Sequence, residues 1–159
     1  GGDLLWLDRE TLLAGRSFRT NSAGIEALRA ILGPIGVEVV EVHLPAFRGP
    51  EEILHLQSSI SLLDERLAVV YRPLLPVPVI EALAARKFEL VEVPEKELAS
   101  QGSNVLAVRP RSALMLRGSP LTKARIEAAG CAVTIIDGDE IAFPGSGGPT
   151  CLTRPLLRG

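Results

Sequence analysis

The order strand, strand, helix, strand recurs about every 50 residues, and this repeat limits the folds that the chain can adopt. Short apolar runs mark the strands, and apolar residues three or four positions apart mark the helices. The predicted elements are 3–7, 11–15, 21–33 and 37–43 in the first unit, 53–63, 67–71, 77–86 and 88–93 in the second, and 104–110, 112–116, 121–130 and 131–137 in the third. A strand at 150–156 begins a last unit.

Units of this size cannot bury their apolar faces alone, so each has to be covered by its neighbours. The repeat therefore predicts an α/β protein made of ββαβ units that stack into an array or a closed ring. The units run over about 3–43, 53–93 and 103–137, with the last starting at 150. We expect residues 1–159 to form a portion of one such domain.

The composition narrows the functional class. Hydrophobic residues make up 47% of the chain and charged residues 23%, and the formal net charge is −2. The basic residues are scattered, which argues against nucleic acid or a membrane surface as a partner, and no apolar run approaches the ~20 residues of a membrane span. The cysteines and histidines show neither a disulfide framework nor metal-ligand spacing, and no phosphate-binding motif is present. We therefore expect a cytoplasmic protein that uses no metal and no cofactor.

Polar or reactive residues occupy the first position of each unit. These residues are Asp3, His55, Asn104 and Cys151, separated by 52, 49 and 47 residues. If rotation about an axis relates the units, equivalent positions gather at one end of that axis. An acid, an imidazole, an amide and a thiol are unusual at one position of a purely structural repeat. The repeat therefore predicts a site where these four side chains converge.

Each of the four residues also has a structural interpretation. A lone histidine such as His55 often lies in the core with its hydrogen bonds satisfied, and Asp3 and Asn104 are typical of turns and strand entries. Cys151 follows two glycines, a proline and a threonine, and is either a nucleophile or a small apolar residue entering a strand. The residues alone leave both interpretations open.

Two other residues and one loop have no catalytic role assigned to them. Cys131 stands in an apolar strand and is expected in the core, whereas His43 ends a strand and is expected at the surface. The loop at 44–52, rich in proline and glycine, is either a lid or simply a connection.

Five motifs together resemble the guanidine-modifying superfamily of arginine deiminases, amidinotransferases and dimethylarginine dimethylaminohydrolases. They are GGD at 1–3, GRSFRTN and GIEAL within 15–28, LHLQSS at 54–59, ASQGSNVLAV at 99–108, and GGPTCLTRPLLR at 147–158. Their order and spacing match over essentially the whole chain. The resemblance implies a five-bladed α/β propeller of ββαβ units, the pentein fold, which agrees with the repeat. Since a complete ring needs roughly 250 residues, the chain is expected to be its C-terminal part.

The resemblance also implies roles for individual residues. Cys151 matches the nucleophile of the family, His55 its general acid and base, and Arg19 the arginine that commonly grips the substrate carboxylate. Asp3 matches the second acid of an acid-Gly-Gly-Asp motif, with a role in substrate binding or in structure, and the first acid would precede Gly1. Asn104 matches a recurring asparagine with an orienting or structural role.

The residue two positions after the histidine separates the members of the superfamily. Arginine deiminases and amidinotransferases have an aspartate there that contacts the guanidinium, whereas dimethylargininases lack the acid. Here the residue is Gln57, which can still accept hydrogen bonds from a substrate. Gln57 therefore favours a dimethylargininase-like hydrolase.

The predicted reaction is thiol-dependent hydrolysis at the guanidinium carbon of arginine or a methylated arginine, through a covalent S-alkylthiouronium on Cys151. The products are an amine and a ureido compound, citrulline. The alternatives are arginine deimination, amidino transfer, or a non-catalytic relative that binds amino acids. The expected partners are the small guanidino substrate and an N-terminal half, or a second chain, that completes the propeller. We expect the chain alone to be inactive and to expose an apolar face where the missing units dock.

Overall fold

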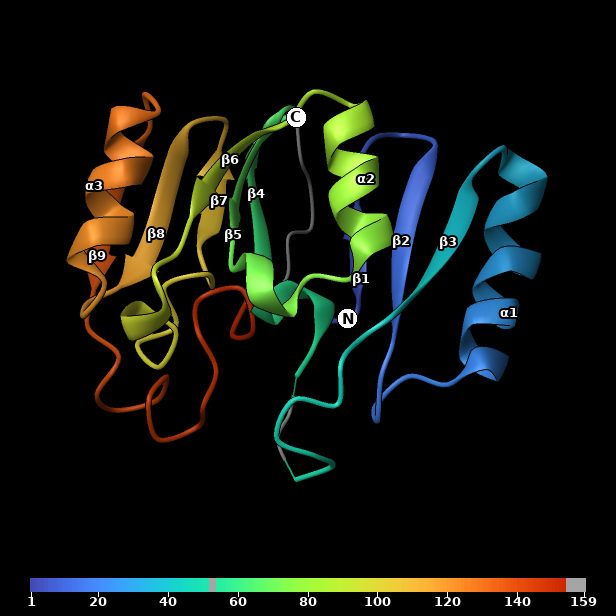
Figure 1. The fold of residues 1–159 in the computed structure, drawn as a ribbon, viewed down its shortest axis with the longest axis horizontal. Coiled ribbons are helices and arrows are strands. Elements are labelled where there is room, and N and C mark those ends of the chain that lie inside the picture. Colours follow the sequence, from blue (N-terminus) through green and yellow to red (C-terminus); the bar gives the residue numbers. More distant parts are fainter. Residues whose placement is uncertain (52–53, 154–159) are drawn as a thin grey trace. The chain divides into compact units, whose positions relative to one another are not determined.

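The computed structural model describes residues 1–51 and 54–153. The strands of this part of the chain form three sheets of three strands each (Figure 1). The first sheet contains β1 (Leu4–Trp6), β2 (Thr11–Arg16) and β3 (Glu38–His43). The second contains β4 (Ile60–Asp64), β5 (Leu67–Val70) and β6 (Glu89–Glu92), and the third β7 (Leu106–Arg109), β8 (Ser112–Leu116) and β9 (Ala132–Ile136). In each sheet the middle strand is antiparallel to the preceding strand and parallel to the following one.

One α-helix connects the two parallel strands in each unit. These helices are α1 (Ser22–Leu32), α2 (Val77–Ala85) and α3 (Pro120–Ala128). Short 3-10 turns occur at η1 (Gly33–Ile35), η2 (Leu56–Ser58), η3 (Arg72–Leu74) and η4 (Glu95–Glu97). The predicted ββαβ order is therefore confirmed in all three units. Within residues 1–51 and 54–153, no helix has the length and apolar character needed to cross a membrane.

The chain separates into two compact parts that do not follow the repeat boundaries. The first part comprises Gly1–Ser58 and Pro73–Lys87, and the second comprises Ser59–Arg72 and the residues from Phe88 onward. The helix α2 therefore groups with the first sheet, although it belongs to the second unit in the sequence. Just after α2, Arg86 donates hydrogen bonds to Asp8 and to Thr11 at the start of β2, each at 2.7 Å. In the second part, α3 likewise packs against strands of two units, β6 and β9.

The core of the first part lies between the first sheet and α1. Leu12 and Ala14 of β2 and Val39 of β3 pack against Ile25 of α1, and all four residues are buried. The strand β2 is buried over its first five residues, as expected for a central strand that is covered on both faces. The apolar face of α1 therefore fixes β2, at whose end the candidate site begins.

In the second part, a buried carboxylate caps α3. Glu97 of η4 is 3% exposed and accepts hydrogen bonds from the N–H groups of Leu121 (2.9 Å) and Thr122 (2.8 Å) and from the Thr122 hydroxyl (2.7 Å). Burial acts to raise the pKa of Glu97, but these hydrogen bonds outweigh burial and lower the pKa. The negative charge also lies at the N-terminal end of the helix, where it interacts favourably with the helix dipole.

Two predicted strand boundaries are wrong. The strand expected at 53–63 begins only at Ile60, because residues 56–58 form η2. Residues 150–152 form a turn and a bend, and the part of the strand expected at 150–156 that starts at 154 lies outside the described residues. Neither His55 nor Cys151 therefore enters a strand within the described chain.

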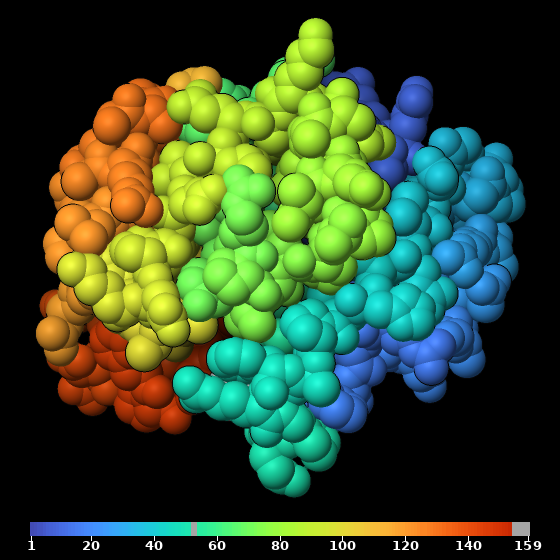
Figure 2. All heavy atoms as spheres, viewed as in Figure 1, coloured from blue at the N-terminus to red at the C-terminus, as the bar shows by residue number. Residues whose placement is uncertain are grey.

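The loop after β3 projects from the surface of the first part (Figure 2). Pro45, Ala46, Phe47 and Arg48 are exposed, and so is His43, as predicted. The start of this loop and the end of β2 line a cavity of about 320 Å³. The start of the loop is therefore part of a cavity wall.

We expect Glu97→Ala to lower the free energy of unfolding by about 2 kcal/mol, because two helix N–H groups lose their acceptor. The folded-state pKa of Glu97 is lowered, so the stabilisation is present at neutral pH and is lost as the pH falls through that pKa. Urea denaturation at neutral and at acid pH measures both effects. The exposed Glu95→Ala serves as the control and should change stability little at either pH; equal losses in the two variants would contradict the capping role.

Candidate active site

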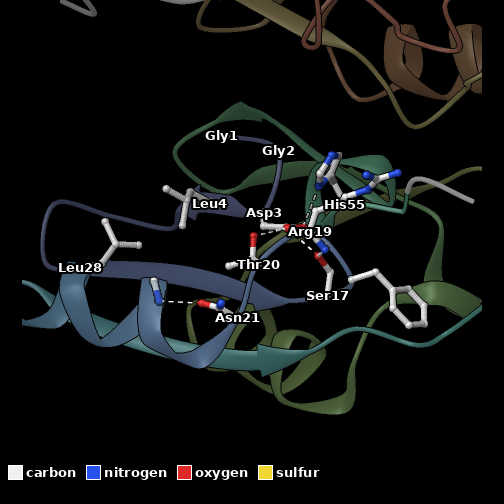
Figure 3. A pocket seen from close by; sticks show the side chains of 12 residues that line it. Gly1, Gly2, Asp3, Leu4, Ser17, Arg19, Thr20, Asn21, Leu28 and His55 are labelled. Atoms are coloured by element: carbon white, nitrogen blue, oxygen red, sulfur yellow. Dashed lines mark hydrogen bonds and ion pairs between the residues drawn. The ribbon is translucent and has the colours of Figure 1, made fainter. Parts of the chain in front are cut away.

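A cavity of about 450 Å³ opens in the first part, beside the start of β1 and the segment that joins β2 to α1 (Figure 3). Three residues that the sequence predicted as site residues line it: Asp3, Arg19 and His55. These residues come from three separate segments, so the tertiary structure brings them together.

Asp3 is the buried polar centre of this cavity wall, with 3% of the residue exposed. One carboxylate oxygen, Oδ2, accepts hydrogen bonds from the hydroxyls of Ser17 (2.8 Å) and Thr20 (2.6 Å), and Oδ1 accepts one from the Leu56 N–H (3.0 Å). Burial acts to raise the pKa of Asp3, but the contact with His55 and these three hydrogen bonds outweigh burial and lower the pKa. Asp3 is therefore held as a carboxylate.

The imidazole of His55 lies against this carboxylate. Nδ1 of His55 is 3.1 Å from Oδ1 of Asp3, an ion-pair distance, although the Nδ1–H direction is not that of a well-aligned hydrogen bond. Nδ1 is buried, whereas the side chain as a whole is 30% exposed. An acidic partner at Nδ1 orients the ring and leaves Nε2 to exchange a proton with a ligand.

Gly2 allows the imidazole to occupy this position. A Cβ at Gly2 would lie 2.8 Å from Cγ and 2.9 Å from Cδ2 of His55. The backbone joins the same two segments, because the Gln57 N–H donates to the Gly2 carbonyl (2.9 Å) and the Leu56 N–H donates to Asp3. These bonds hold residues 55–58 in a turn, which is why the strand that the sequence predicted at 53–63 starts later.

Arg19 lies on the segment between β2 and α1. Its backbone N–H donates to the Ser17 hydroxyl (3.0 Å), and its side chain is exposed at the cavity. Figure 3 shows Arg19 at the same end of the cavity as Asp3 and His55. A guanidinium in this position suits a ligand that carries a carboxylate.

Gln57 does not line this cavity. Its side-chain Nε2 donates to the Leu4 carbonyl (2.6 Å), and its backbone N–H donates to Gly2. Both bonds fasten the turn that carries His55 to the start of β1. The geometry therefore gives Gln57 a structural role, and it lends no support to the expected contact with a substrate.

A second polar group, in the second part, contains Asn104 and Cys151. Asn104 is 6% exposed, and its Nδ2 donates to Sγ of Cys151 at 3.2 Å. Its Oδ1 accepts hydrogen bonds from the N–H (3.0 Å) and the hydroxyl (2.7 Å) of Thr150. Cys151 itself is exposed, so its thiol is both anchored and accessible to a ligand.

The glycines before Cys151 are required by close approach rather than by flexibility alone. A Cβ at Gly148 would lie 2.4 Å from Cγ of Asn104, and one at Gly147 would lie 3.2 Å from Cβ of Cys151. A side chain at Gly148 would overlap Asn104, so the loop can approach Asn104 this closely only with glycine there, whereas at Gly147 the fit is merely tight.

The other cysteine has the predicted structural role. Cys131 is 5% exposed, and burial raises the pKa of its thiol, which favours the neutral and unreactive form. Among the residues that the structure describes, no group of three or more His, Cys, Asp and Glu side chains is arranged to hold a metal ion.

The structure thus groups Asp3, His55 and Arg19 in the first part, and Asn104 with Cys151 in the second. Convergence of all these residues on one substrate stays a prediction.

Sequence reasoning missed the residues that support these groups. Ser17 and Thr20 hold Asp3, and Thr150 holds Asn104. The hydroxyl residues on either side of Arg19 in SFRT were visible in the sequence, but their partner is 14 and 17 residues earlier in the chain.

The comparisons with known sequences identify the family. Residues 1–158 match the family described as N,N dimethylarginine dimethylhydrolase, eukaryotic. The chain belongs to this family. An N(G),N(G)-dimethylarginine dimethylaminohydrolase of Streptomyces coelicolor is 31% identical over 156 residues, which cover 98% of this chain and 54% of that protein. The chain spans about half the length of the curated relatives it matches.

Solved structures agree on the fold. A dimethylarginine dimethylaminohydrolase of Pseudomonas aeruginosa, in complex with citrulline, has a TM-score of 0.73 and 24% identity over 94% of this chain and 52% of its own. An amidinotransferase of Microseira wollei, from the saxitoxin biosynthetic pathway, has a TM-score of 0.80 and 18% identity over 99% of this chain and 47% of its own. The predicted fold, part of the α/β propeller of the guanidine-modifying superfamily, is therefore confirmed.

We expect Gly2→Ala to displace the His55 ring from Asp3, because the added methyl group would overlap the imidazole. Gly24→Ala is a matched control, since a Cβ there lies 3.6 Å from its nearest neighbour, an ordinary contact, and alanine suits the helix α1. NMR chemical shifts of the His55 ring measure the displacement. Unchanged His55 shifts in Gly2→Ala would show that the glycine does not determine the ring position.

Proposed function

We propose that this chain contributes the cysteine, histidine and arginine of a hydrolase that cleaves the guanidinium group of arginine or a methylated arginine. The observation that carries the proposal is the contact of His55 with the buried Asp3, beside a cavity that also bears Arg19. Membership of the dimethylarginine dimethylhydrolase family supports this assignment. The Pseudomonas aeruginosa relative was solved in complex with citrulline, which is the ureido compound that the proposed reaction would release.

In the first half of the proposed reaction, the thiolate of Cys151 attacks the central guanidinium carbon and forms a C–S bond. A guanidinium is a weak electrophile, so a strong nucleophile and a fixed substrate plane are required. The tetrahedral adduct breaks one C–N bond, and His55 donates its proton to the departing amine. An S-alkylthiouronium on Cys151 remains.

In the second half, His55 has become a base and removes a proton from water. The resulting hydroxide adds to the thiouronium carbon, and the C–S bond breaks with its electron pair returning to sulfur. The products are a ureido compound and the free enzyme. No metal or organic cofactor takes part in the proposed reaction.

Asp3 and Arg19 have distinct proposed roles. Asp3 contacts His55 at Nδ1 and is hydrogen-bonded by other groups on both oxygens, so we assign it to orientation of the imidazole rather than to the guanidinium. Arg19, which is exposed at the cavity, is assigned to the substrate carboxylate. If this assignment holds, the substrate has to carry a carboxylate.

The proposed activity also requires chain segments beyond these 159 residues, from the same polypeptide or from a second chain. The support is the span of the chain, which is about half of its curated relatives. In the superfamily that the sequence resembles, further carboxylates from the other half bind the guanidinium. We therefore expect no turnover by the chain alone, and recovery of turnover when the complementing half is added.

The complete protein, incubated with asymmetric dimethylarginine, is expected to release dimethylamine and citrulline. Arginine supplied in its place would release ammonia if the protein is a deiminase, and a new guanidino compound formed with an added amine would indicate amidino transfer. Chromatography of the products with an amine assay separates these three reactions. The absence of any ureido product from both substrates would exclude the proposed hydrolysis.

We expect Cys151→Ala to lower kcat by roughly a thousandfold or more, because the covalent step has no other nucleophile. Cys131→Ala is the matched control, since Cys131 is buried in the core and should leave kcat nearly unchanged in folded protein. A haloacetamidine probe with mass spectrometry should label Cys151 and leave Cys131 unmodified. Turnover that persists in Cys151→Ala would overturn the assignment.

A further inference from the structure

We propose that Asn104 is the hydrogen-bond donor that holds negative charge on the sulfur of Cys151. This inference deepens the proposed function and rests on it for its catalytic meaning. It assigns chemistry to a residue for which the sequence predicted only an orienting or structural role.

The orientation of the Asn104 carboxamide is fixed by its neighbours. The backbone N–H of Thr150 can only donate, so the atom that it contacts at 3.0 Å has to be the oxygen, Oδ1. The Thr150 hydroxyl, 2.7 Å from the same oxygen, agrees with this assignment. The amide group Nδ2 therefore faces Sγ of Cys151, at 3.2 Å.

A donor in this position favours the charged form of the sulfur. An N–H bond to a thiolate is charge-assisted and is stronger than the same bond to a neutral thiol. The residue is 6% exposed, so little water competes for the donor from the side of Asn104. The contact therefore stabilises negative charge on Sγ whenever the sulfur carries it.

The surroundings hold the donor and the sulfur at a fixed distance. The backbone N–H of Asn104 donates to the Gln101 carbonyl (2.9 Å), which anchors the donor, and Thr150 stands immediately before Cys151 in the chain. A side chain at Gly148 would collide with Asn104 and push the thiol-bearing loop away. Anchoring of the loop uses Oδ1 of Asn104, whereas stabilisation of the thiolate uses Nδ2, so the two roles can be separated by substitution.

The decisive variant is Asn104→Asp in the complete protein. An aspartate keeps an oxygen for the Thr150 N–H, but it presents a second oxygen to the sulfur in place of a donor. Asn104→Ala removes both functions. Thr150→Val removes the hydroxyl, with its contact to Oδ1 of Asn104 (2.7 Å) and its long contact to Sγ of Cys151 (4.0 Å), and leaves the Nδ2 donor in place. All three are made on a Cys131→Ala background, so that Cys151 is the only cysteine of this chain.

Two measurements at one fixed pH near neutrality report the thiolate without any substrate: its ultraviolet absorbance and the rate of alkylation by iodoacetamide. We expect both signals to fall roughly tenfold or more in Asn104→Asp, and to stay within about threefold of the parent in Thr150→Val. Circular dichroism and thermal melting identify variants that remain folded. Equal alkylation and equal absorbance in folded Asn104→Asp and its parent would overturn the inference.

A measurement on unsubstituted Asn104 covers the case in which Asn104→Asp fails to fold. If Nδ2 donates to Sγ, the side-chain amide resonances of Asn104 shift when Cys151 is alkylated, and unchanged resonances overturn the inference. Because none of these readouts requires turnover, their failure is distinct from failure of the proposed hydrolysis. A protein that hydrolyses no guanidino substrate can still show the Asn104 effect on its thiol.

Discussion

The arrangement of the candidate site in the first part depends on the contacts of one buried carboxylate, that of Asp3. A charge removed from water is costly unless its oxygens are paired, so every group that contacts Asp3 has a definite position. Those groups are the Ser17 and Thr20 hydroxyls, the Leu56 N–H and the His55 ring. They come from two segments, 17–20 and 55–56, and Asp3 stands on a third. One carboxylate therefore determines where the Arg19 segment and the imidazole lie.

In the second part, the neutral side chain of Asn104 has contacts that correspond to those of Asp3. In each part, a buried polar residue at the first position of a unit accepts a backbone N–H from the start of the following unit through Oδ1: Asp3 accepts from Leu56, and Asn104 from Thr150. The same side chain then contacts the reactive group next to that N–H, which is His55 in one case and Cys151 in the other. The repeat thus explains why His55 stands about one repeat length after Asp3 in the sequence, and Cys151 about one repeat length after Asn104.

The helices make the units dependent on one another. The helix α2 groups with the first sheet rather than with its own, and α3 packs against strands of two units. Each unit therefore lacks a complete core of its own, as expected for repeats that bury their apolar faces against neighbours.

The sequence by itself determined the ββαβ order, the burial of Cys131 and the family, because apolar periodicity and local motifs carry that information. It did not determine that His55 lies in a turn, since that turn is held by hydrogen bonds to Asp3 and Gly2, far earlier in the chain. Gln57 fastens that turn through a bond to the Leu4 carbonyl, a contact that its place in a motif did not indicate. Which oxygen and which nitrogen of a side chain meet which partner depends on contacts between distant segments, and only the tertiary structure decides those contacts.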